Sequence, residues 1–370
     1  MLKLLSQKAS RVKSELICKA LFGMGPKSLL GIDIGTSAVK LLELEADSGD
    51  SDFSRIKSLS VVPLPEGAVE GKQIVDPDAV VAALAEVVKL SGSSVRSVAA
   101  AVSGVTAITR ILKLPANLSD REMETEVEFE ADKKIPQPLD EIRYDYDILG
   151  LSEADPDTVD VLLVASREDV VGELTSILEL AGLKPAVIDV ESYAINHCYN
   201  LARSDSEPEC VAVADIGASS IDFHVMKGET VSYTREYNFG GRALTRALQG
   251  QYGLSFQEAE KMKVDEDWPS GARESVVQDF LSSLTQEVRG ALQIYQAAGK
   301  GEKIMRLYLA GGCAAMPGVE EVIGDVLDFP VSVLNPLTDL KHPRRITEGR
   351  LKMMGPAMII ACGLATRRPD

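Results

Sequence analysis

Two stretches of the chain share one pattern, in which an apolar strand runs into a glycine turn and then resumes as a second strand. Residues 28–47 and residues 209–229 both have apolar positions that alternate after the turn. Aligned without gaps, residues 33–37 (DIGTS) lie over residues 215–219 (DIGAS). A repeat with so long a spacing predicts two homologous halves, because the repeats of a solenoid follow one another about every 20–50 residues.

Segments with helical and strand-like periodicity alternate through the rest of the chain. Apolar spacing predicts a helix over 77–91, followed by strands within 95–104 and 106–115. Ser119 and Glu122 form a capping box at the start of a strongly acidic helix. Together these elements predict a globular α/β protein.

The N-terminal segment differs in charge from everything after it. The chain has a formal net charge of −17, which argues against non-specific binding of nucleic acid. Residues 1–28 instead carry six basic residues against Glu15, and their apolar positions share one helix face. Either residues 1–22 form a helix at an anionic membrane surface, or they dock on protein or remain a loosely ordered arm.

Several classes of site are excluded by what the sequence lacks. The five cysteines are scattered without a C-x-x-C spacing, which indicates reduced thiols, and the three histidines lie far apart with no metal-binding pattern. No 18-residue apolar run and no secretory signal pattern is present, so we expect a cytosolic protein.

Each glycine turn offers the chemistry of a phosphate site. Backbone N–H groups in such a turn form a concave nest for phosphate oxygens, and glycine lets the backbone come close. A carboxylate suits hydrated Mg²⁺, which also binds the phosphates of a substrate. We therefore expect Asp33 and Asp215 to orient Mg²⁺, mainly through water.

Three further stretches have candidate roles. A Walker A loop is excluded, since the nearest match, residues 67–73, is one residue short and lacks the hydroxyl for Mg²⁺; we interpret it as a surface loop. Residues 309–318 bring paired glycines to a helix start, which suits either a flat base or close strand–helix packing. Glu260 and Lys263 share a helix face, as nucleoside contacts or as an ordinary ion pair.

Taken in order, these motifs resemble the actin, Hsp70 and FtsA superfamily. They are the two DIG loops, VIDVESYAINHC, the FGG helix, AEKMK, AGG and GPAMIIACGLA, and they cover nearly the whole chain after residue 28. The resemblance implies an α/β fold of duplicated ribonuclease H-like halves that close on Mg-ATP, with an inserted 1C-type subdomain.

The resemblance also implies roles for the residues of each motif. The first phosphate loop would comprise Asp33, Gly35, Thr36, Ser37 and Lys40. The second would comprise Asp215, Gly217, Ala218, Ser219 and Ser220. The phosphates would be covered by Gly240 and Gly241. Adenosine would be held by Glu260 and Lys263 and backed by Gly311, Gly312 and Met316, with Cys313 beside the base.

By the same resemblance the chain would divide into five parts. The expected division is a basic segment 1–28, subdomain 1A (29–97 and 184–203), subdomain 1C (98–183), subdomain 2A (209–245 and 303–370) and subdomain 2B (246–302). The stretch 204–209 would be a polar linker between the halves.

Within the superfamily, two segments look like the PilM family of type IV pilus assembly proteins. They are KKIPQPLDEIRYDYDIL and NFGGRALTRALQGQYGLSFQEAEKMK. The match implies a bacterial ATP-binding scaffold, cytoplasmic and peripheral at the inner membrane. It would bind the N-terminal cytoplasmic peptide of a bitopic PilN-like protein between subdomains 1A and 1C, and contact other platform proteins and the pilus motor ATPases. Ala218, where more active relatives keep Gly or a hydroxyl, implies slow or absent turnover.

Two other functions fit the same fold. One is a filament-forming cell-division protein similar to FtsA. The other is a small-molecule kinase, in which Asp215 would be the catalytic base against a substrate hydroxyl. Neither insertion has a distinct substrate-binding motif.

Overall fold

The computed structural model describes residues 29–46, 53–152, 155–203, 210–228, 230–299 and 303–368. The predictions for the basic segment 1–28 and for the linker 204–209 lie outside these residues.

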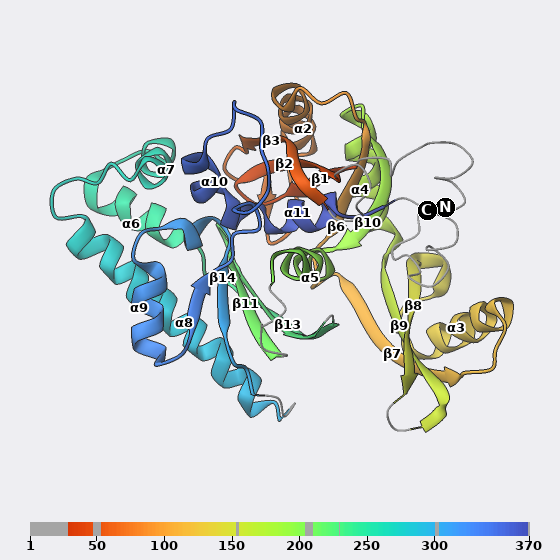
Figure 1. The fold of residues 1–370 in the computed structure, drawn as a ribbon. Coiled ribbons are helices and arrows are strands. Elements are labelled where there is room, and N and C mark those ends of the chain that lie inside the picture. The colour runs from red at the N-terminus through yellow and green to blue at the C-terminus, as the bar shows by residue number, and fades with distance from the viewer. Residues whose placement is uncertain are drawn as a thin grey trace.

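Two five-stranded mixed sheets of the same design form the body of the molecule (Figure 1). The first has, in order, β3 (Phe53–Pro63), β2 (Ala38–Ala46), β1 (Leu30–Ile34), β6 (Ser97–Val102) and β10 (Lys184–Val190). The second has β13 (Thr230–Tyr237), β12 (Ile221–Lys227), β11 (Cys210–Ile216), β14 (Leu307–Ala310) and β15 (Val331–Val333). In both, three antiparallel strands continue into two parallel ones, which confirms the predicted duplication.

Helices cover the outer face of the first sheet because their apolar stripes match its buried residues. α2 (Pro77–Ser91) spans the predicted residues: Asp76 caps the N–H of Ala79 at 3.0 Å, and Gly92 ends the helix in the left-handed conformation. α4 (Glu168–Leu180) packs beside it, and both contribute to one core with β1, β6 and β10.

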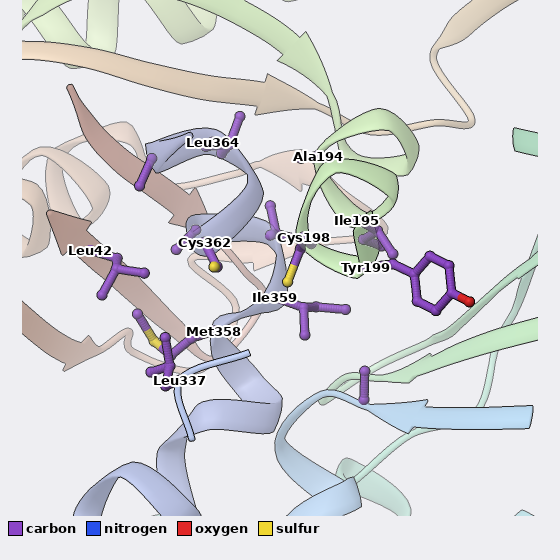
Figure 2. Close-up of a cluster of buried hydrophobic side chains, with 14 of the residues drawn as sticks. Leu42, Ala194, Ile195, Cys198, Tyr199, Leu337, Met358, Ile359, Cys362 and Leu364 are labelled. Atoms are coloured by element: carbon purple, nitrogen blue, oxygen red, sulfur yellow. The ribbon is translucent and has the colours of Figure 1, made fainter. Parts of the chain in front are cut away.

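A second core joins the two halves (Figure 2). α5 (Glu191–Ala202) and α11 (Ile359–Ala365) pack against each other, with Cys198 and Cys362 buried between them as free thiols. Gly363 permits this contact, since a Cβ there would lie 1.7 Å from the carbonyl oxygen of Ala194. α11 also packs on β1, so it lies with the first half, although the sequence-based division placed 303–370 in subdomain 2A.

The inserted block projects from the first half, away from the helices of the second (Figure 1). Its antiparallel sheet has the order β7 (Ala107–Pro115), β9 (Asp155–Arg167), β8 (Ile142–Ser152), and α3 (Asp120–Lys134) packs on it with the predicted capping box. The block is narrower than the expected 98–183, because β6 and α4 belong to the first half. The parallel pairing of β6 with β1 joins distant residues, so no local pattern signals it.

The remaining helices belong to the second half. They are α6 (Arg242–Tyr252), α7 (Phe256–Asp265), α8 (Gln278–Ala297), α9 (Val319–Leu327) and α10 (Glu348–Met354). α8 packs its apolar face on the second sheet. Among the described residues, no helix has both the length and the apolar character needed to cross a bilayer.

Candidate functional site

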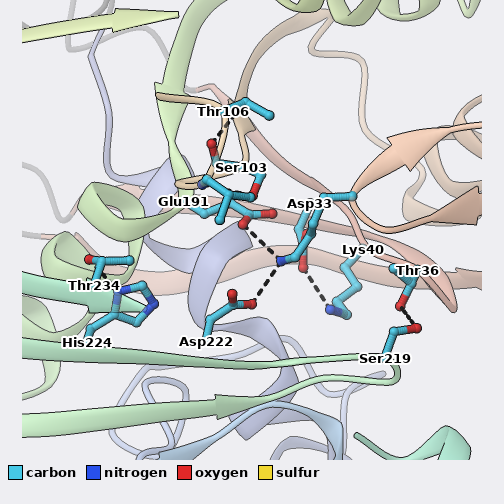
Figure 3. A network of polar contacts seen from close by, with 12 residues as sticks. Asp33, Thr36, Lys40, Ser103, Thr106, Glu191, Ser219, Asp222, His224 and Thr234 are labelled. Carbon is cyan, nitrogen blue, oxygen red and sulfur yellow. Dashed lines mark hydrogen bonds and ion pairs between the residues drawn. The ribbon is translucent and has the colours of Figure 1, made fainter. Parts of the chain in front are cut away.

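The two glycine turns have the same backbone geometry and face each other. The N–H of Gly35 donates to the carbonyl of Ala38 at 3.0 Å, and the N–H of Gly217 donates to the carbonyl of Ser220 at 2.9 Å. Across the gap, the Ser219 hydroxyl donates to the Thr36 hydroxyl at 3.2 Å (Figure 3). A pocket of about 630 Å³ lies between the halves at these turns.

Most of the residues expected to hold the nucleotide line this pocket. They are Asp33, Gly35, Thr36, Ser37, Lys40, Asp215, Gly217, Ala218, Ser220, Gly311 and Gly312. The other expected residues are not part of its lining. They are Ser219, Gly240, Gly241, Glu260, Lys263, Cys313 and Met316.

The first turn has a neutralised carboxylate. Asp33 and Lys40 lie opposite each other on β1 and β2, and the Lys40 ammonium is 2.7 Å from the Asp33 carboxylate. Burial disfavours the charged lysine, but the charge and hydrogen bond of Asp33 outweigh burial and raise the pKa of Lys40. Lys40 therefore stays cationic beside the turn.

The second turn has like charges instead. Asp215 and Asp222 occupy the matching positions on β11 and β12, directly across the strand pair. Burial, followed by the charge of Asp222, raises the pKa of Asp215 to about 7. This carboxyl is therefore poised to gain from a cation, which is what Mg²⁺ would supply.

Lys72 supplies positive charge to this side of the cleft, and its place corrects the interpretation of residues 67–73 as a surface loop. Its side chain is only 15% exposed, and its ammonium lies 3.0 Å from Glu191 and 2.9 Å from Asp222. Burial opposes the charge, but the two carboxylates together raise the pKa of Lys72.

Sequence reasoning did not identify Lys72, Glu191 or Asp222 as members of the site. The only available signal was Asp222, which lies over Lys40 in the ungapped alignment of the two turns. Glu191 and Lys72 are 119 residues apart, so nothing local connects them.

Gly311 brings strand β14 against the second turn. Its φ is +85°, and a Cβ there would lie 2.4 Å from both the Asp215 Oδ1 and the carbonyl oxygen of Ile216. No other residue type fits this conformation and space without displacement. Because Gly311 and Gly312 have no side chains, their backbone atoms line the pocket directly, as close approach of a base or phosphate chain would require.

Gly240 and Gly241 lie next to the second turn, where the N–H of Gly241 donates to the carbonyl of Gly217 at 3.0 Å. The N–H of Arg242 donates to the carbonyl of Ala218 at 2.8 Å, which ties the start of α6 to the turn. These contacts fix the backbone of the turn.

Glu260 and Lys263 form a compact polar cluster next to Gly241. The Lys263 ammonium lies 2.6 Å from the Glu260 carboxylate and 2.9 Å from the Thr245 hydroxyl, which also bonds Glu260. Cys313 is buried nearby, and burial raises the pKa of its thiol to about 11. A nucleoside role for these residues remains a prediction. Met316 packs against the core of the second half.

The carboxylates fit a magnesium ion that is held mainly through water and phosphate. Asp33 and Asp215 are both buried, and both line the pocket. Among the described residues, no cluster of three or more metal-ligating side chains is arranged as a protein cage. Mg²⁺ commonly binds one or two carboxylates together with substrate phosphates, which matches this sparse arrangement.

Comparison with known proteins identifies relatives of this chain. The curated protein EutJ for ethanolamine utilization from Escherichia coli (strain K12) is 27% identical over 150 residues, which is 40% of this chain and 47% of that protein. The chain thus spans about half the length of the curated relatives it matches. A solved EutJ from Carboxydothermus hydrogenoformans has a TM-score of 0.55 at 15% identity, covers 97% of this chain and 98% of its own, and shares the fold.

A stronger likeness extends over nearly the whole chain. A chain of the solved PilM-PilN type IV pilus biogenesis complex is 28% identical, with a TM-score of 0.75, covering 94% of this chain and 100% of that one. The family model described as type IV pilus assembly protein PilM matches residues 31–369. The chain therefore belongs to the PilM family of type IV pilus assembly proteins.

Proposed function

We propose that this chain is an actin-like, ATP-binding scaffold of the type IV pilus platform at the cytoplasmic face of the inner membrane. In this role it binds the N-terminal cytoplasmic tail of a PilN-like membrane protein, and bound nucleotide changes that affinity. The likeness to the solved PilM-PilN complex over 94% of this chain supports the partner.

The pair of matching turns supports ATP as the ligand. Lys40 and the turn N–H groups would meet the phosphates, while Asp33 and Asp215 would orient hydrated Mg²⁺. The metal supplies charge neutralisation of the phosphate chain when it is bound. We expect slow turnover, because Ala218 offers no hydroxyl to the phosphates.

The inserted block is the proposed receptor for the tail. Its sheet leaves β7 and β8 as edges, and an extended peptide can add to such an edge through backbone hydrogen bonds. Exposed apolar side chains accompany these edges, among them Ile111 on β7 and Leu151 on β8. Side-chain pockets next to an edge give such a peptide its specificity.

One observation carries the proposed sensitivity to nucleotide. The pocket that contains both glycine turns also reaches Ser103 and Thr106, just before β7, and Arg167 and Asp169, at the end of β9 and the start of α4. The glycine turns and the base of the inserted block therefore share one cavity. A ligand that moves the halves would also move the walls of this junction.

The test is a titration of the full chain into a fluorescent peptide with the N-terminal sequence of the partner, without nucleotide, with Mg-ADP and with Mg-ATP. We expect the affinities to differ by about tenfold between nucleotide states, a coupling typical of linked sites. Ile111→Asp should abolish binding, whereas the matched control Val326→Asp, an exposed apolar residue on α9, should not. Equal affinities in all states would contradict the nucleotide dependence, and no binding at all would contradict the partner.

A further inference from the structure

The hairpin that carries Lys72 has an unusual turn. β4 (Val69–Glu70) and β5 (Gln73–Ile74) pair closely, so Gly71 and Lys72 are the two central turn residues. Their φ angles are +52° and +64°, as a type I′ turn requires, and a lysine seldom adopts this conformation. Strained residues of this kind concentrate at ligand clamps and switches.

The hairpin is anchored on one side and reaches into the cleft on the other. Ala68 and Val69 are buried in the core of the first half, and the N–H groups of Val75 and Asp76 both donate to the carbonyl of Ala68. With this anchor the turn holds Lys72 in the wall of the phosphate pocket.

Lys72 joins the two halves of the molecule through one ammonium group. Glu191 begins α5 in the first half, whereas Asp222 lies on β12 in the second. Figure 3 shows their carboxylates approaching the same point from opposite sides of the cleft, where the Lys72 ammonium is 3.0 Å from one and 2.9 Å from the other. Breaking the Asp222 contact would remove this ion pair between the hairpin and the second half.

Carboxylates outnumber cations around this point before any ligand enters. The cations of the pocket lining at the turns are Lys40 and Lys72, and the anions are Asp33, Asp215, Glu191 and Asp222. Lys40 is already held by Asp33. A polyphosphate that enters adds several negative charges, so it competes with Asp222 for the Lys72 ammonium.

We propose that Lys72 is a latch between the halves, and that the terminal phosphate of a bound nucleoside triphosphate draws it away from Asp222. A diphosphate lacks this group and leaves the latch closed. The cleft thereby distinguishes the two nucleotides through the position of one side chain. This inference rests on the proposed nucleotide site and adds the element that responds to the last phosphate.

The test compares the affinities for ATP and ADP, measured by calorimetry on the full chain with Mg²⁺. Lys72→Met removes the cation, so the preference for ATP should fall by about tenfold, or roughly 1.4 kcal/mol. Asp222→Asn removes the competitor but keeps the cation, so the preference should rise instead. Lys89→Met, which breaks an exposed ion pair with Glu86 on α2, is the matched control and should leave the ratio unchanged.

Opposite signs in the two variants are the signature of the latch, because both variants break the same ion pair. The double variant Lys72→Met/Asp222→Asn should behave like Lys72→Met alone, since without the lysine there is nothing to release. A rise in ATP preference that persists in the double variant would show simple charge repulsion by Asp222 and overturn the proposal. A shift of the same sign in both single variants would do so too.

Hydrogen exchange without nucleotide separates this proposal from the proposed function. In both single variants the amides of the β4–β5 hairpin should exchange at least about tenfold faster than in the unmodified protein, whatever ligand the cleft binds. If the unmodified chain bound no ATP and the variants still showed this faster exchange, the nucleotide function would fail while the closed latch stood. Unchanged exchange in both variants would overturn the latch.

Discussion

The two glycine turns share a backbone but differ in charge. In the first, Asp33 lies across the strand pair from Lys40 at 2.7 Å, whereas in the second Asp215 lies across from Asp222. The first turn is neutralised by its own hairpin, and the second depends on Lys72 from a distant hairpin of the other half. Duplication therefore preserved the backbone geometry of the turn, whereas the electrostatics of the second turn depend on a contact between the halves.

The largest expected effect tests this contrast at the two matching positions. Lys40→Met leaves the buried Asp33 carboxylate unpaired and should lower the free energy of unfolding by about 4 kcal/mol. Asp222→Asn removes a like charge facing Asp215 and also an ion pair, so we expect a change under about 1 kcal/mol. Urea unfolding of both variants measures the difference. Equal losses would show that the turns do not differ in charge as described.

The next effect concerns the walls of the turns. Gly311→Ala forces a Cβ to within 2.4 Å of Asp215 in a left-handed backbone, and we expect a loss of about 3 kcal/mol together with weaker ATP binding. Gly35→Ala, in the first turn itself, is the comparison, because there the nearest atom, the carbonyl oxygen of Ala38, is 3.4 Å away. In thermal unfolding, the melting temperature of Gly311→Ala should be well below that of Gly35→Ala. The reverse order would contradict the packing of β14 on the second turn.

The like charges of the second turn also predict a dependence on pH. Because the folded pKa of Asp215 is about 7 and an aspartate in an unfolded chain titrates near about 3.9, the native state binds more protons between these values. Stability should thus fall as the pH rises from about 4 to 7. In Asp215→Asn the free energy of unfolding should fall less over this range, by on the order of 2 kcal/mol.

Glu191, whose pKa burial also raises to about 7, should leave a residual fall in that variant. Unfolding by urea at about pH 4 and about pH 7, the two limits of this window, gives the slope. The control Glu86→Gln, on the exposed face of α2, should keep the unmodified slope. A slope in Asp215→Asn equal to that of the unmodified chain would contradict a protonated Asp215 in the closed cleft.

The smallest effect sharpens the comparison at the point where the turns meet. Ser219→Ala removes the hydroxyl that donates to Thr36, and we expect a loss of only about 0.5–1 kcal/mol. The melting temperature should move by a few degrees at most. A loss as large as that of Lys40→Met would mean that this hydrogen bond, and not the charges, holds the cleft.

The sequence was sufficient for features that repeat or that depend on local periodicity. The turns at Asp33 and Asp215, the helix at 77–91 and the capping box at Ser119 all follow from neighbouring residues, and the structure has each of them. The duplicated fold follows from the first of these.

Features that depend on distant contacts were beyond local reasoning. Lys72 gains its role from Asp222, 150 residues later, and its loop matched no phosphate-binding motif. The expected limits of the inserted block differ from those in the structure for the same reason. The local sequence of β6 predicts only a strand, and its parallel pairing with β1 is what places it in the first sheet. The helix α11 likewise packs on the first half, and its apolar composition alone does not predict which half it contacts.

Calorimetric titration of ATP into the intact chain, with and without Mg²⁺, tests the central claim that the two facing turns form one magnesium–nucleotide site. We expect binding that depends on Mg²⁺ and that weakens by about tenfold in both Asp33→Asn and Asp215→Asn, because each removes a metal-orienting carboxylate from the pocket. Absence of binding by the unmodified chain, or binding that neither variant alters, would contradict the account.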